Sequence, residues 1–241
     1  MSNVLTDFGA GMTAFAAPVD ARIAFIRRTY AHVAGAVALF VAASWAFYTS
    51  GIGEKIAMWA FGSGGAWRWL LIIGGFAALG WLGQSMARAD RARSMQYGGL
   101  VLYAGIEALV FSPMIWYANE VARGVLGPAA VITLLVFAGL TGIVLTTKKD
   151  FAFLGMFLKV GMLVALGLIV CGAIFGFNLG LWFSGAMILM ASGAILYSTS
   201  RVLHQYRTDQ HVSAAIELFA AVALLFWYVL RLLMELNGRN R

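Results

Sequence analysis

The sequence is dominated by apolar stretches of about 20 residues, which short polar or basic turns separate. A helix needs about 20 apolar residues to cross a hydrocarbon core of about 30 Å. The pattern therefore predicts an all-α integral membrane protein, built as a seven-transmembrane-helix bundle. The segment around Glu54 and Lys55 is expected to be a loop. The seven stretches cover approximately residues 30–48, 69–86, 95–117, 128–146, 151–177, 180–200 and 212–234.

Composition excludes a water-soluble fold. Hydrophobic residues make up 62% of the 241 residues and charged residues 11%, whereas soluble domains carry about 25% charged residues. The net charge of +7 is compatible with nucleic-acid binding, but the basic residues stand in ones to threes between apolar stretches. That spacing is typical of membrane topology signals. We therefore expect the lipid bilayer as surroundings and no nucleic-acid partner.

The predicted organisation is one membrane domain with short flanking segments. Residues 1–29 form a cytoplasmic N-terminal segment, in which 19–28 are an amphipathic lead-in. Residues 30–234 form the seven-helix domain, and 235–241 form a short basic tail. This arrangement places eleven of the 17 Lys and Arg residues on the side of the N-terminus and six on the other side. The positive-inside rule then predicts a cytoplasmic N-terminus and a C-terminus outside.

Glu107 is an acidic residue about twelve positions into the apolar stretch 95–117. An ionised carboxyl group near the middle of a bilayer is costly, and such residues usually face a bundle interior or a wet cavity. Tyr103 lies one helical turn earlier on the same face and could donate a hydrogen bond. Two interpretations stay open. Glu107 is either part of an ion or proton pathway, or a neutral acid that fixes the helix register.

Polar residues gather where the sixth stretch ends, within residues 192–211. Ser198, Arg201 and Gln205 share one helical face there and are candidates for a functional pocket. The alternative is structural: the hydroxyl groups bond to their own helix, and Arg201 extends to the membrane surface. Glu217 lies about one and a half turns into the next helix. An ion pair between Arg201 and Glu217 is predicted to close the cytoplasmic end.

No catalytic or metal site is expected. His204, Asp209 and His211 could be zinc ligands, but the spacing of a zinc motif is missing. Ser184 and Ser192 each precede a glycine, yet no glycine stands two residues before either one, and no histidine lies deep in a stretch. A serine protease site is therefore not indicated. We expect a protein that is not an enzyme and that holds no cofactor.

Four segments resemble the Bax inhibitor-1 family (transmembrane Bax inhibitor motif proteins), in its bacterial branch. They are RRTYAH, TTKKDFAFLG, ASGAILYSTSRVLH followed by YRTDQ, and ALLFWYVLRLL. The resemblance implies a bundle with the last helix at its centre, in the bacterial inner membrane. It also implies a part in stress protection through one of two roles. One is modulation of a membrane-anchored AAA+ protease of the FtsH type, and the other is a pH-sensitive calcium leak, with Ca²⁺ as the transported ion.

Two positions depart from the pattern of the family. Ser198 stands where many members carry an acid in the sixth helix, and Ala221 stands where calcium-leak members carry an aspartate in the seventh. Two carboxylates that share a proton could sense pH, whereas serine and alanine cannot. We therefore expect a regulator of membrane protein quality control, a modulator of an FtsH-type protease. The alternative is a calcium or proton leak that uses Glu107 and Glu217 instead.

Overall fold

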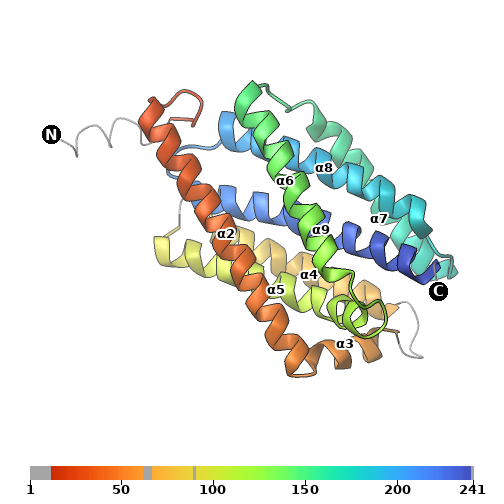
Figure 1. Ribbon diagram of the computed structural model, residues 1–241. Coiled ribbons are helices and arrows are strands. Elements are labelled where there is room, and N and C mark those ends of the chain that lie inside the picture. The colour runs from red at the N-terminus through yellow and green to blue at the C-terminus, as the bar shows by residue number, and fades with distance from the viewer. Residues whose placement is uncertain (1–11, 62–66, 89–90, 240–241) are drawn as a thin grey trace.

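The computed structural model describes residues 12–61, 67–88 and 91–239 of the chain (Figure 1). These residues form eight helices joined by short loops. A single antiparallel bridge joins Thr13 to Arg207. The helices are α2 (Val19–Thr49), α3 (Ile52–Phe61), α4 (Trp67–Met86), α5 (Arg93–Glu120), α6 (Leu126–Thr147), α7 (Leu154–Phe175), α8 (Gly180–His204) and α9 (His211–Arg239).

Six of the described helices are long and apolar enough to cross a membrane: α2, α5, α6, α7, α8 and α9. They have 22 to 31 residues, which is more than the roughly 20 that a bilayer core requires. The prediction of an all-α membrane protein is therefore confirmed, with six candidate spans among the described residues. Helix α4 has 20 residues. A count of seven crossings, with α4 as the seventh, stays a prediction.

The expected loop around Glu54 and Lys55 is wrong, because these residues lie in α3. This helix of 10 residues is too short for a span, but it has a small-residue face that packs on the backbone of α5. Ala57 and Ala60 are buried. A Cβ atom on Gly53 would lie 2.9 Å from a carbonyl oxygen of α5. Burial of this face explains why the segment folds as a helix.

Helix α9 lies at the centre of the bundle. It packs against α2, α5, α6 and α8, and α6 crosses in front of it in Figure 1. It contributes residues to all four apolar clusters of the core. A helix that is apolar all round is expected to be buried. Its most deeply buried side chains include Val212, Ile216, Leu218, Phe219, Leu225 and Leu230.

Helix α9 also extends into the segment 235–241, which was predicted to be a tail. It ends at Arg239, and its last turns carry an ion pair of 3.0 Å between Arg231 and Glu235. The hydroxyl group of Ser184 in α8 donates to the carboxylate of Glu235 at 3.4 Å. These contacts stabilise the last turns as helix. At the other end of the chain, the lead-in 19–28 is continuous with the first span in α2.

The segment before α2 packs on the loop between α8 and α9, residues 205–210. The backbone N–H of Ala14 donates to the carbonyl of Tyr206 at 2.9 Å, and Ala14 is fully buried. The ring of Phe15 stacks on His204 at 4.8 Å. We call this end of the bundle the loop end. It also holds the start of α2 and the end of α4, where the hydroxyl group of Ser213 donates to the carbonyl of Ala87.

Candidate functional site

The predicted site residues fall into two groups. Arg201 and Glu217 meet at the loop end, whereas Tyr103 and Glu107 lie deeper, inside the bundle. Ser198 is buried and belongs to neither group.

Arg201 and Glu217 form the predicted ion pair. Helix α8 ends at His204, and six loop residues turn the chain back into α9. The last turn of α8 therefore faces the first turns of α9. Nη1 of Arg201 lies 3.1 Å from Oε1 of Glu217, and its Nε donates to the amide oxygen of Gln205 at 3.1 Å. The side chains of Arg201 and Glu217 are 34% and 19% exposed, so the pair is partly shielded from solvent.

Tyr206 completes this arrangement and was not predicted. Its hydroxyl group donates to Oε2 of Glu217 at 2.5 Å. The guanidinium group of Arg201 lies 5.6 Å from the ring centre of Tyr206 and 5.6 Å from that of Tyr197, which are cation–π distances. Burial, followed by the charge of Glu217, raises the pKa of Tyr206. Arg201, Glu217 and Tyr206 are called the loop-end network below.

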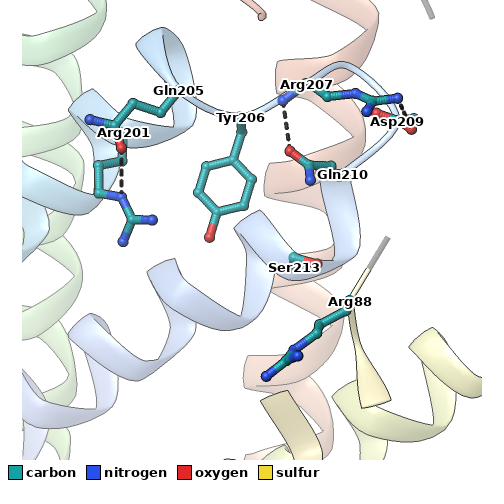
Figure 2. A pocket seen from close by; sticks show the side chains of 8 residues that line it. All are labelled: Arg88, Arg201, Gln205, Tyr206, Arg207, Asp209, Gln210 and Ser213. Atoms are coloured by element: carbon teal, nitrogen blue, oxygen red, sulfur yellow. Dashed lines mark hydrogen bonds and ion pairs between the residues drawn. The ribbon is translucent and has the colours of Figure 1, made fainter. Parts of the chain in front are cut away.

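Two cavities adjoin the loop-end network. The end cavity has a volume of about 710 Å³, and Figure 2 shows the Tyr206 ring projecting into it while Arg207 turns toward Asp209. It is lined by Arg88, Arg201, Gln205, Tyr206, Arg207, Asp209, Gln210 and Ser213. The inner cavity has a volume of about 370 Å³. It is lined by Gln84, Ala87, Arg88, Arg201, Tyr206, Ser213, Ile216, Glu217 and Ala220.

Ser198 is not among the residues that line either cavity. The polar run that follows it instead anchors the turn between α6 and α7. The hydroxyl group of Ser200 donates to Asp150 at 3.1 Å and accepts the backbone N–H of Phe151 at 2.9 Å. Asp150 also accepts the N–H of Ala152 at 2.9 Å. Ser200 thus holds the turn between α6 and α7 against the end of α8, which is a structural role.

Glu107 lies in the interior of the bundle. It stands 14 residues after Arg93 in the 28-residue α5 and is only 4% exposed. Tyr103, also 4% exposed, interacts with its carboxyl group, as the spacing predicted. The Tyr103 hydroxyl group also interacts with the side chain of Gln84 in α4. Because Gln84 lines the inner cavity, it connects the two groups of site residues.

The three residues considered as zinc ligands have separate neighbours. His204 places Nδ1 3.0 Å from the carbonyl oxygen of Ser200. His211 instead lies beside His32, with ring centres 5.0 Å apart. Asp209 pairs with Arg207 at 3.2 Å. Within the described ranges, no three His, Cys, Asp or Glu side chains are placed to hold a metal ion.

Sequence reasoning missed Gln84 and Tyr206. Both lie at the ends of predicted helices, near the membrane surface. Polar side chains are common there, so their presence did not indicate a site. Tyr206 could nevertheless have been identified from the sequence, because it directly follows Gln205, the last residue of the polar helical face with Ser198 and Arg201. No comparable signal exists for Gln84, since its importance depends on how α4 is rotated toward α9.

The chain matches the family model described as "Inhibitor of apoptosis-promoting Bax1" over residues 22–239. Similar proteins include an uncharacterized protein of Neisseria meningitidis serogroup A, 30% identical over 149 residues (58% of this chain and 63% of the relative). The "Modulator of FtsH protease YccA" of Escherichia coli K12 is 32% identical over 133 residues (54% and 60%). "Bax inhibitor 1" of Schizosaccharomyces pombe is 31% identical over 178 residues (71% and 64%).

The chain spans less than two thirds of the length of each of these three relatives. The family model, by contrast, covers nearly the whole chain, including the helices that carry both groups of site residues. The chain therefore belongs to the Bax inhibitor-1 family of multi-pass membrane proteins.

Proposed function

We propose that this protein is a regulator of membrane protein quality control that acts by contact with a membrane-anchored protease of the FtsH type. The name of the E. coli relative, a modulator of FtsH protease, supports this proposal. The observation that carries it is the ordered loop end. The loop-end network and the bridge from Thr13 to Arg207 hold two distant chain segments in one surface. A protein that acts by contact needs such a fixed surface.

The proposal includes a topology in the bacterial inner membrane. Helices α2 and α4 to α9 cross the membrane seven times, with the loop end in the cytoplasm and the C-terminus outside. The distribution of Lys and Arg supports this orientation. The protease would then meet the loop end on the cytoplasmic side.

Photo-crosslinking in native membranes tests the proposal. Benzoyl-phenylalanine is placed at Gln205, which is exposed at the loop end, or at Trp182, which is 91% exposed at the opposite end of α8. Position 205 is expected to capture the protease, and position 182 is the matched control. If neither position captures the protease in membranes that contain it, the proposal fails.

A proton or calcium leak is the second candidate, and Glu107 is the observation that favours it. A carboxyl group buried at mid-helix beside a tyrosine is typical of an ion or proton pathway. Ser198 and Ala221 offer no carboxylate for Ca²⁺, which prefers oxygen ligands that include carboxylates. A proton leak is therefore favoured over a calcium leak within this candidate.

Flux across liposomes that contain the purified protein tests the leak. The Glu107→Gln variant is expected to change the pH response. Glu120→Gln makes the same change at the exposed end of α5 and is expected to behave like the wild type. A wild-type flux no higher than that of empty liposomes, for both protons and Ca²⁺, would exclude this candidate.

A further inference from the structure

The end cavity and the inner cavity form one polar route into the bundle. Arg88 and Gln205 in the lining of the end cavity are exposed, so this cavity opens at the loop end. Both cavities share four lining residues and therefore adjoin. The shared residues are Arg88, Arg201, Tyr206 and Ser213.

The inner cavity extends about two helical turns into the bundle. Its lining on α9 runs from Ser213 to Ala220, a rise of about 10 Å at 1.5 Å per residue. On the side of α4, its lining consists of Gln84 in the last turn of the helix and of Ala87 and Arg88 just after it. A volume of about 370 Å³ has room for on the order of ten water molecules, since each takes about 30 Å³ in the liquid.

Tyr103 lines neither cavity, but it packs on α4 and interacts with Gln84, which lines the inner cavity. The backbones of α4 and α5 approach closely there, because a Cβ atom on Gly99 would lie 2.6 Å from the carbonyl oxygen of Gly83. A Cβ atom on Gly83 would lie 3.2 Å from Cβ of Tyr103. Small residues permit this approach. Tyr103 interacts with the side chains of both Gln84 and Glu107.

An aromatic cluster lies on the opposite side of Glu107, one turn farther from the loop end. Phe111 packs on Phe40 with ring centres 5.1 Å apart, on Phe226 at 5.8 Å and on Trp227 at 4.9 Å. Phe111 is 3% exposed and Phe40 is 8% exposed. Apart from the indole N–H of Trp227, these rings are apolar, so the packed cluster is less suited to carry a proton than the side of Gln84.

We propose that Glu107 exchanges protons with one side of the membrane only, the side of the loop end, through the two cavities and the Tyr103 hydroxyl group. Water in the inner cavity supplies the proton. Tyr103 passes it to the carboxyl group, and Gln84 holds the hydroxyl group in place. Among the described residues, Tyr103 is the titratable side chain that acts on Glu107. The charged groups along the route are Arg88, Arg201 and Glu217, with Arg207 and Asp209 at the end cavity.

This inference rests on the leak, the second candidate function, for its physiological use. One-sided access and net transport are nevertheless separate measurements. If flux is absent and one-sided access is found, only the leak fails. If flux is found and Glu107 is reached equally from both sides, only the inference fails.

Cysteine accessibility tests the route. In a Cys171→Ser background, which removes the single cysteine of the chain, Ala220→Cys lies in the lining of the inner cavity. Ala223→Cys is the matched control, one turn along on α9 and buried in the apolar core. A charged, membrane-impermeant thiol reagent is added to each side of oriented membranes in turn. Gln205→Cys at the exposed loop identifies the side of the loop end.

Ala220→Cys is expected to react at least about tenfold faster than Ala223→Cys, because thiols in apolar surroundings are inert. It should react only from the side of the loop end. Equal rates for the two variants, or reaction of Ala220→Cys from the opposite side, would overturn the proposal. Thermal unfolding of both variants checks that they are folded.

A second measurement follows Glu107 itself in the protein without new cysteines. The carboxyl band of Glu107 is identified in infrared spectra by its loss in Glu107→Gln. After a pH jump on one side of sealed, buffered vesicles, this band should change quickly from the side of the loop end and slowly from the other. Tyr103→Phe should slow the fast exchange. An equal rate from both sides would contradict one-sided access.

Discussion

The loop-end network makes a quantitative prediction that a double-mutant cycle can check. Glu217→Gln removes the charge but keeps a group that accepts the Tyr206 hydroxyl, and Arg201→Met removes the guanidinium group but keeps most of the side-chain volume. Exposed ion pairs contribute about 0–1 kcal/mol, and breaking a buried pair costs about 3–5 kcal/mol. With side chains 34% and 19% exposed, we expect a coupling free energy between Arg201 and Glu217 of about 1–2 kcal/mol.

The assay is reversible unfolding by denaturant in mild detergent, with the free energy of unfolding measured for the wild type, both single variants and the double variant. The pair of Arg207 and Asp209 is the matched control. It lies in the loop between α8 and α9 with a distance of 3.2 Å between Nη2 of Arg207 and Oδ2 of Asp209, but its side chains are 51% and 34% exposed. The cycle of Arg207→Gln and Asp209→Asn is expected to give a coupling of less than about 1 kcal/mol.

The comparison of the two cycles decides whether shielding from solvent strengthens the loop-end network. If the coupling of Arg201 and Glu217 does not exceed that of Arg207 and Asp209, the network does not stabilise the loop end. The loop end would then have no ion-pair energy to hold it as a fixed contact surface.

Three further predictions concern stability. Gly99→Ala should lower the free energy of unfolding by about 1–3 kcal/mol, because the new Cβ atom would overlap with backbone atoms of α4. Gly105→Ala is the control on the same helix. Its Cβ atom would meet nothing within 4 Å, so this change should raise the free energy of unfolding by about 0.5–1 kcal/mol. Ser200→Ala should cost about 0.5–1.5 kcal/mol through its lost bond to Asp150. Folding raises the pKa of Tyr206 above the ordinary value of 10.0. Above pH 10.0 the unfolded chain therefore loses this proton while the folded protein keeps it, which favours unfolding. The wild type should lose stability relative to Tyr206→Phe as pH rises above 10.0. Unfolding free energies across pH check all three, and unchanged values would contradict them.

The features that depend on one helix alone could be predicted from the sequence. Apolar runs of sufficient length define most of the spans, and the spacing of Tyr103 and Glu107 places them on one face. The pairing of Arg201 with Glu217 was also predictable, because a short loop fixes how the end of α8 meets the start of α9. In each case, covalent continuity or helical periodicity decides the geometry.

The features that depend on how separate helices rotate and approach could not be predicted. The contact of Gln84 with Tyr103 follows from the close approach of α4 and α5 at Gly83 and Gly99, and glycines are too frequent in this chain to single out that pair. Helix α3 was missed for a different reason. Its stability comes from burial of two alanines against α5, a tertiary effect that outweighs the loop-like Gly, Glu and Lys at its start.

The two candidate functions place different demands on this arrangement. A regulator that acts by contact needs the loop-end network intact, and both cavities are present while Arg201 and Glu217 are paired. A leak needs a path on both sides of Glu107. On the side of the loop end, the proposed path runs through the two cavities, so it does not require the loop-end network to break. The barrier is the aromatic cluster around Phe111, which lies between α2, α5 and α9. If the protein leaks protons, we therefore expect movement of α9 relative to α2 and α5 at the far side of Glu107 to control the flux.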